Sequence, residues 1–140
     1  MKFTRTANAV WHKDLKTGSG TISTESTVLN KAAYAFKTRF ENGNPGTNPE
    51  ELLGAAHAGC FTMQLSALLS EQGFIPDELA TQALVTFEDG SIALIELIVD
   101  ASVPNISAEV FNATAQKAKE ICPLSKALQA VKIELKANLK

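Results

Sequence analysis

The first forty residues carry short runs in which apolar and polar side chains alternate. Residues 3–13 alternate loosely and end near the apolar pair Val10 and Trp11, and the turn-forming segment 16–20 leads into a second run at 21–29. A third, mostly apolar segment at 32–40 precedes a loop rich in Gly, Asn and Pro. Alternation predicts strands, and the turn between the first two runs predicts a hairpin. We therefore expect three short strands before residue 41.

A long apolar segment comes next, and its start is well marked. Asn48 is suited to the N-cap of a helix, Pro49 to its first position, and Glu51 to the third residue of a capping box. The following residues are apolar on nearly every side as far as Leu69, and Gly73 is typical of a helix end. This pattern predicts a buried central helix.

One side of such a helix needs cover from outside the chain. A single sheet in a small domain covers one side, so the other is expected to pack against a second copy of the same helix. Small residues would let two helices approach closely: Gly54, Ala55, Ala56, Ala58 and Gly59.

The second half of the chain predicts a hairpin, a helix, a short helix and a closing strand. Ser107 is placed to cap the first of these helices. The expected elements are strands at 78–90 and 91–103, a helix at 108–121, a short helix from Pro123 and a strand at 131–139. This order is typical of an α+β fold, and no repeat or linker divides the chain, so we expect one domain over 1–140.

Composition limits the classes of function. The chain has 140 residues, 45% of them hydrophobic and 20% charged, with a net charge of −2. This balance is typical of a globular protein and offers no attraction for nucleic acid or anionic membranes. The N-terminus does not resemble a signal peptide, and no transmembrane segment is expected, so the cytoplasm is the expected location. In that reducing compartment, two cysteines indicate either buried inert thiols or a redox pair.

Both cysteines have neighbours that could influence their reactivity. Cys60 lies three residues after His57 on the predicted helix, so the imidazole could stabilise a thiolate or could simply pack and bond a backbone carbonyl. Cys122 directly precedes Pro123, near the N-cap of the short helix, where a helix dipole favours negative charge. By themselves these placements do not decide between packing and chemistry.

Arginine is scarce in this sequence, which draws attention to Arg39. The chain contains only two arginines, and Arg39 lies just before the loop that leads to the Cys60 helix. A guanidinium can hold a carboxylate and a thiolate together, and Glu50 is the obvious carboxylate. Ten residues of straight helix separate Glu50 from Cys60 by about 15 Å. Either the helix breaks near Gly54, or Arg39 and Glu50 reach the Cys60 of a second subunit.

Four stretches of the chain resemble a known family. They are GTNPEELLGAAHAGCF at 46–61, STESTVLN at 23–30, TRFENG at 38–43 and KAKEICPLSKAL at 117–128. Their order along almost the whole chain is similar to the OsmC/Ohr family of organic hydroperoxide reductases, and more to its OsmC branch. The resemblance implies an α+β, intertwined homodimer in which antiparallel sheets wrap around long central helices. It also implies a peroxidase, without metal or other cofactor, that reduces organic hydroperoxides to alcohols and serves in oxidative and osmotic stress defence.

The resemblance also assigns roles to individual residues. Cys60 matches the family's peroxidatic cysteine and Cys122 its resolving cysteine. Glu50 matches the glutamate of the Asn-Pro-Glu motif, and Arg39 matches the arginine of the OsmC branch, whereas Ohr relatives carry theirs earlier. The implied cycle passes through a Cys60 sulfenic acid and a Cys60–Cys122 disulfide. A dithiol, in the family a lipoylated protein, would reduce that disulfide.

Two other functions compete with this one. A non-enzymatic dimer of the same fold could bind ligands or sense oxidation through its thiols. A metal site could use Cys60, Cys122, His57 and His12, although their spacing matches no standard zinc pattern.

Overall fold

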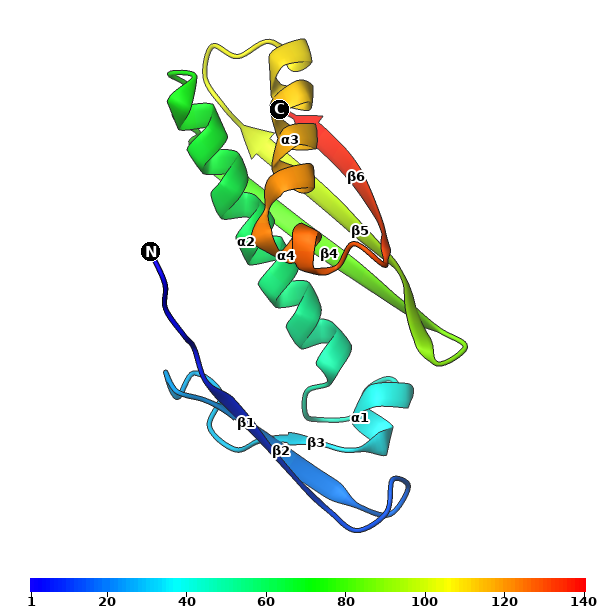
Figure 1. The fold of residues 1–140 in the computed structure, drawn as a ribbon. Coiled ribbons are helices and arrows are strands. Elements are labelled where there is room, and N and C mark those ends of the chain that lie inside the picture. Colours follow the sequence, from blue (N-terminus) through cyan, green and yellow to red (C-terminus); the bar gives the residue numbers. More distant parts are fainter. The chain divides into compact units, whose positions relative to one another are not determined.

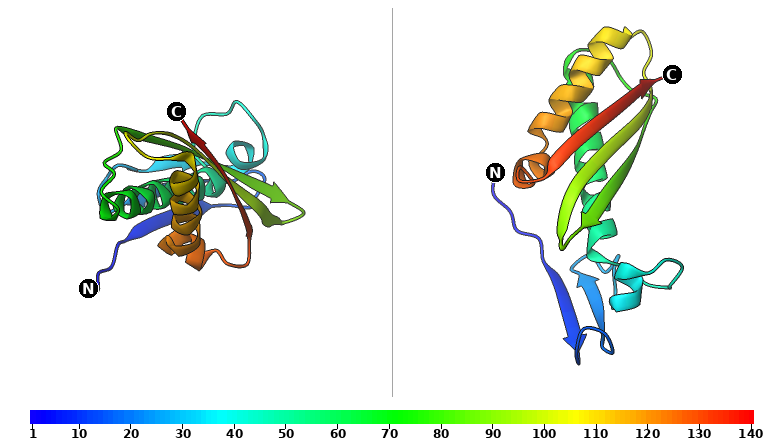
Figure 2. Two further views of the ribbon diagram at one scale, coloured as in Figure 1. Left: turned by 90° about the horizontal axis from the view of Figure 1, so that it is seen from above. Right: turned by 90° about the vertical axis from the view of Figure 1, so that its right-hand side faces the viewer.

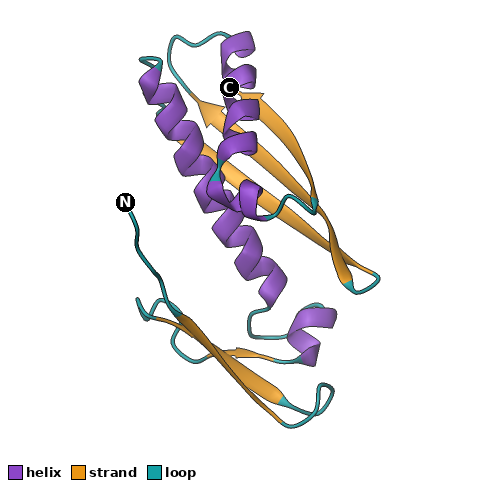
Figure 3. Ribbon diagram, in the orientation of Figure 1, coloured by secondary structure: helices purple, strands orange, loops and turns teal.

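The computed structural model describes all 140 residues, which form two compact units. The N-terminal unit covers Met1–Leu52 and the C-terminal unit covers Leu53–Lys140. Figure 1 traces the chain through both units, and Figure 3 distinguishes their helices and strands. The elements are mixed in the way expected of an α+β protein, which confirms the predicted fold class. A single domain over 1–140 stays a prediction.

The N-terminal unit is a three-stranded antiparallel sheet followed by a short helix. Its strands lie in the order β1-β2-β3, and the hairpin predicted between the first two is present. The elements are β1 (Ala7–His12), β2 (Ser19–Thr24), β3 (Ala32–Tyr34) and α1 (Phe36–Phe40).

The prediction of one strand over 32–40 is wrong beyond Tyr34. The Thr38 hydroxyl accepts a hydrogen bond from the backbone N–H of Ala35 at 2.8 Å and caps the turn that starts α1. Phe36 and Phe40, four residues apart, then pack with their ring centroids 4.7 Å apart. Four-residue spacing brings side chains together on a helix, so this aromatic pair favours α1 over a longer strand.

Helix α2 (Pro49–Glu71) begins and ends where its sequence signals predict. The Asn48 side chain accepts a hydrogen bond from the backbone N–H of Glu51 at 2.8 Å, as expected of an N-cap. The Glu51 carboxylate accepts a bond from the Thr47 hydroxyl at 2.6 Å rather than closing the expected capping box. At the other end, Gly73 has φ = 86°, a conformation that glycine adopts without strain.

The C-terminal unit packs α2 and α3 on one face of a second sheet (Figure 2). Its strands are β4 (Glu78–Glu88), β5 (Ser91–Ser102) and β6 (Lys132–Leu139), and its further helices are α3 (Ala108–Ile121) and α4 (Pro123–Ala127). The expected hairpin joins β4 to β5, and Ser107 caps α3 by accepting a bond from the backbone N–H of Val110.

The expectation of wholly antiparallel sheets is wrong for one strand pair. β6 runs parallel to β5, whereas β4 pairs with β5 in the antiparallel sense. The chain crosses from the end of β5 through α3 and α4 before it enters β6, and a crossover of that length can return it in the same direction.

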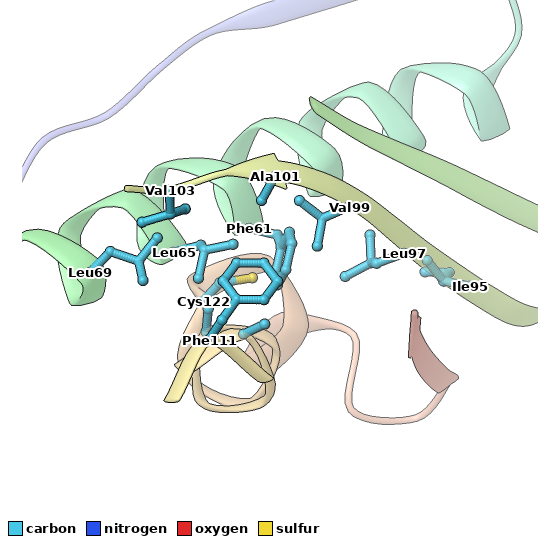
Figure 4. Packing of buried hydrophobic residues seen from close by; sticks show 12 residues of the cluster. Phe61, Leu65, Leu69, Ile95, Leu97, Val99, Ala101, Val103, Phe111 and Cys122 are labelled. Atoms are coloured by element: carbon cyan, nitrogen blue, oxygen red, sulfur yellow. The ribbon is translucent and has the colours of Figure 1, made fainter. Parts of the chain in front are cut away.

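The core of the C-terminal unit lies between its sheet and the two long helices. Figure 4 shows Phe61 from α2, Phe111 from α3 and the thiol of Cys122 gathered beside β5. The inward residues of β5 occupy alternate positions and are fully buried: Ile95, Leu97, Val99 and Ala101. Cys122, a candidate reactive residue, is thus part of the buried core of this unit.

Helix α2 buries only one of its faces in this chain. Its buried residues recur every three or four positions: Gly54, His57, Phe61, Leu65 and Leu69. The opposite face is exposed and carries small or flexible apolar residues, namely Ala55, Ala56, Gly59, Met63 and Ala67. Contrary to the sequence expectation, α2 is long and apolar enough for a membrane span by length and composition, a test that core helices of soluble proteins also pass.

Candidate functional site

Arg39 and Glu50 form a two-pronged ion pair in the N-terminal unit. Nη2 of Arg39 donates to Oε1 of Glu50 at 2.7 Å, and Nε donates to Oε1 and Oε2 at 3.1 and 3.3 Å. The Arg39 side chain is 36% exposed and that of Glu50 13% exposed, so solvent screens the pair only in part. Paired contacts of this kind fix the plane of the guanidinium.

The local folds of α1 and α2 place these two side chains together. Arg39 lies on α1, and Glu50 lies in the first turn of α2, where a carboxylate also complements the helix dipole. The side chain of Asn48 donates to the backbone carbonyl of Thr38 at 3.1 Å and so ties the start of α2 to α1. One residue thus caps the helix and helps to set the geometry of the ion pair.

An apolar cavity adjoins Arg39. It has a volume of about 290 Å³ and is lined largely by aromatic side chains, with Arg39 among the lining residues. The others are Trp11, Leu15, Tyr34, Ala35, Phe36, Phe40 and Pro49. A cationic donor beside an apolar hollow can hold a molecule that has one polar and one apolar end.

The two cysteines, 62 positions apart in the sequence, are neighbours in the C-terminal unit. Both are free thiols; Cys122 is fully buried, and Cys60 is partly buried against the core. Cys122 ends α3 and is the N-cap of α4, as its position before Pro123 predicted. The side chain of Cys60 is within hydrogen-bonding reach of that of Cys122, so the structure brings together the two sulfurs that a disulfide would require.

Burial raises the pKa of the Cys60 thiol above its ordinary value. The backbone N–H of Leu124 bonds the sulfur and lowers the pKa in part, while the neighbouring Cys122 adds to the rise. None of these influences is a positive charge. The surroundings of Cys60 within the C-terminal unit thus favour the thiol, and a reactive thiolate needs a cation from elsewhere.

His57 bonds a side chain that sequence reasoning did not consider. Its Nε2 lies 2.8 Å from Oγ of Ser125, and that hydroxyl lies 3.1 Å from Sγ of Cys122. Neither ring nitrogen bonds a backbone carbonyl, which was one of the two alternatives from the sequence, and Nδ1 of His57 has no partner. His57 and Ser125 are 68 positions apart, so only the folded chain reveals this link.

The sequence left open how Arg39 and Glu50 could serve Cys60. Helix α2 is continuous from Pro49 to Glu71, so the break considered near Gly54 is not present. Gly54 instead faces β4, where a Cβ atom would lie 3.3 Å from a methyl group of Val85. No cluster of three or more His, Cys, Asp or Glu residues is arranged to hold a metal ion.

Comparisons with known proteins agree on one family. The model of the OsmC-like protein family matches residues 41–136. The chain is 47% identical over 134 residues to Peroxiredoxin OsmC of Escherichia coli K12, which covers 93% of each protein. It is 32% identical over 98 residues to the organic hydroperoxide resistance protein-like protein of Staphylococcus aureus USA300, which covers 66% of this chain and 70% of that protein.

A solved structure extends the agreement to the fold. The crystal structure of the organic hydroperoxide resistance protein OhrB of Bacillus subtilis matches with a TM-score of 0.69 and 27% identity, over 99% of this chain and 98% of that one. Family model, sequence identity and fold thus point the same way, and the chain belongs to the OsmC-like protein family.

Proposed function

We propose that this protein is a thiol-dependent peroxidase that reduces organic hydroperoxides to alcohols. The observation that carries the proposal is the placement of Cys60 beside the buried thiol of Cys122 in a chain 47% identical to Peroxiredoxin OsmC. When one of two neighbouring thiols is oxidised to a sulfenic acid, the other can condense with it to a disulfide without a cofactor.

In the first step of the proposed cycle, the Cys60 thiolate attacks the outer oxygen of the hydroperoxide. The O–O bond breaks, the sulfur becomes a sulfenic acid, and the alkoxide takes up a proton to leave as the alcohol. Arg39 supplies the positive charge that favours the thiolate, and Glu50 holds the guanidinium in place. The apolar cavity beside Arg39 supports an organic substrate over hydrogen peroxide.

In the second step, Cys122 attacks the Cys60 sulfur, and a Cys60–Cys122 disulfide and water form. A dithiol then restores both thiols by exchange, and lipoylated proteins carry a group of this kind. We place this cycle in the cytoplasm, where thiol reductants are abundant.

The proposed assembly is a homodimer. The exposed face of α2 carries small apolar residues, and Met63 is 77% exposed, a surface that a second copy of the helix would cover. Because α2 is unbroken between Glu50 and Cys60, Arg39 and Glu50 would serve the Cys60 of the second subunit in such a dimer. Light scattering should give twice the chain mass of 15.0 kDa. A monomer at micromolar concentration would contradict this part of the proposal.

One observation favours the rival function of a redox-sensing or binding dimer. The raised pKa of Cys60 makes it a slow nucleophile unless a cation compensates. A sensor would be oxidised once and would not turn over with a dithiol present.

Repeated turnover by the wild type separates the two functions, and Cys60→Ser is the negative control for it. We expect this substitution to abolish consumption of cumene hydroperoxide with dithiothreitol, because the attacking sulfur is gone. Cys122→Ser, the matched control, should consume one equivalent of hydroperoxide when dithiothreitol is left out, and form a sulfenic acid that intact-mass measurement detects. Multiple turnovers by the wild type support the peroxidase. Turnover that survives Cys60→Ser, or a wild type that stops after one equivalent, would refute it.

A further inference from the structure

His57, Ser125 and Cys122 form a hydrogen-bonded chain inside the C-terminal unit. It runs from Nε2 of His57 on α2 through Oγ of Ser125 on α4 to Sγ of Cys122, with steps of 2.8 and 3.1 Å. All three residues are buried. We propose that His57 and Ser125 are a proton relay that removes the thiol proton of Cys122 as this residue attacks the oxidised Cys60. The inference rests on the proposed function, because it concerns the second step of that cycle.

The donors and acceptors of this chain are consistent with a relay. The Cys122 thiol can donate to Oγ of Ser125, and the Ser125 hydroxyl can donate to Nε2 of a neutral imidazole whose proton is on Nδ1. The backbone N–H of Ser125 also points at Sγ of Cys122, at 3.4 Å, and would stabilise the thiolate that results. Each group in the chain thus has a partner before and after the proton moves.

The buried imidazole is neutral and can accept a proton. Burial alone lowers the pKa of His57. Of the two thiols, Cys122 is linked to it through Ser125, and Cys60 lies one turn along α2. The protonated imidazole would be costly in isolation, but it forms together with the Cys122 thiolate and exists only while the sulfur attacks.

Packing alone does not account for an imidazole at position 57. Its Nδ1 is buried and has no hydrogen-bond partner, which is rare for a polar atom in a protein core. An apolar side chain of similar size would fill the same space and leave no polar atom unpaired. An imidazole can take up and release a proton at Nε2, whereas an apolar side chain cannot.

Cys122 needs an internal base because solvent does not reach it. Its exposure is 0%, so hydroxide can take its proton only when the structure opens transiently, and an internal base acts faster. In the proposed step the proton of Cys122 passes to Oγ of Ser125 while the Ser125 proton passes to Nε2 of His57. The sulfur of Cys122 then bonds the sulfur of Cys60, and the S–O bond breaks. The leaving hydroxide recovers the proton from His57 by the reverse path and departs as water.

A mixed disulfide isolates the nucleophilicity of Cys122 from any peroxide chemistry. 5,5′-Dithiobis(2-nitrobenzoate) should first label the more accessible Cys60 and release one thionitrobenzoate. Attack by Cys122 then releases a second, coloured thionitrobenzoate as the Cys60–Cys122 disulfide forms. Cys122→Ser defines the assay because it should release no second equivalent.

We expect His57→Gln and Ser125→Ala to slow the second release about 100-fold at pH 7, a typical contribution of a general base. The wild-type rate should be nearly independent of pH above 7. In both variants the rate of the second release should rise about tenfold per pH unit, because hydroxide must replace the imidazole as the base. Glutamine can still bond the Ser125 hydroxyl but takes up no proton, so a merely structural histidine would not alter the pH profile.

Two further variants guard against effects of folding. Ser125→Thr keeps the hydroxyl and should restore most of the wild-type rate. Thr114→Val removes another buried hydroxyl from the same unit and should leave the second release unchanged. Equal rates and equal pH profiles in wild type, His57→Gln and Ser125→Ala would overturn the relay.

The outcome for the relay can be told apart from the outcome for the peroxidase. If cumene hydroperoxide leaves both thiols reduced while the second release still depends on His57, the proposed function fails and the relay stands. If the hydroperoxide oxidises Cys60 normally while the rate of the second release is unchanged in His57→Gln and Ser125→Ala, the peroxidase stands and the relay fails.

Discussion

The ion pair of the N-terminal unit and the thiol cluster of the C-terminal unit lie in opposite electrostatic surroundings. Arg39 and Glu50 are charged, joined by three short contacts and partly open to solvent. Cys122 and His57 are completely buried and are linked through Ser125 by hydrogen bonds between neutral groups. The first arrangement supplies a fixed positive charge, and the second supplies a path for a proton.

Because of this difference, each region supports a different step of the proposed cycle. Attack on the hydroperoxide needs a thiolate at Cys60, whose own surroundings raise its pKa, so this step depends on a cation. Disulfide formation needs the proton of the buried Cys122 to leave, so this step depends on a base. Substitutions in the ion pair should therefore impair the first step alone, and substitutions in the relay the second step alone.

The largest effect is expected from Arg39→Met. Without the guanidinium, the rate of Cys60 oxidation by cumene hydroperoxide should fall about 100-fold, the usual loss when one charged donor is removed from a reacting centre. Arg39→Lys should lose about tenfold, because it keeps the charge but not the two-pronged contact. Stopped-flow measurements in the Cys122→Ser background isolate this step.

The other arginine provides a matched control. Arg5 is 72% exposed and only 3.8 Å from Glu25, so Arg5→Met should leave the oxidation rate unchanged. An Arg39→Met variant as fast as wild type, or an Arg5→Met variant as slow as Arg39→Met, would contradict the role of the ion pair. The second thionitrobenzoate release should be equal in all of these variants when Cys122 is present.

A smaller effect is expected from Glu50→Gln. The pair is partly exposed, so losing its charge should cost about 1 kcal/mol and slow Cys60 oxidation about fivefold. Glu51→Gln is the matched control, because Glu51 has the next position on α2 but bonds the Thr47 hydroxyl instead of Arg39. Equal losses in both variants would mean that the helix dipole, rather than the positioning of Arg39, is responsible.

Local signals in the sequence predicted most of the elements but not how distant ones meet. Asn48, Ser107 and Pro123 mark helix starts through contacts within a few residues, and the structure has helices at these places. Segment 36–40 was misread because its apolar spacing suits a short strand as well as one helical turn. The parallel pairing of β6 depends on a crossover of some thirty residues that no local pattern encodes.

The candidate site shows the same limit. The pairing of Arg39 with Glu50 could be predicted from charge, because the chain has few arginines and the two residues are eleven positions apart. The contact of Cys60 with Cys122 was implied only by the family resemblance. Ser125 was missed altogether, because an ordinary serine in the first turn of a short helix carries no signal until the fold places it between an imidazole and a thiol.

The smallest expected effect is on the pH dependence of the free energy of unfolding, which tests whether the buried His57 is neutral. Burial lowers the pKa of His57 in the folded protein, while in the unfolded chain it is about 6.5. As the pH falls below about 6.5, the unfolded chain therefore binds a proton before the folded one does, and the free energy of unfolding decreases. Urea unfolding followed by circular dichroism between pH 7 and pH 5 should show this decrease in wild type, and it should shrink in His57→Gln. His12→Gln, which removes the exposed histidine, and Arg39→Met should both retain it. Wild type and His57→Gln with the same dependence would mean that the pKa of His57 is the same in the folded and the unfolded chain, which would contradict the buried, neutral imidazole that the relay requires.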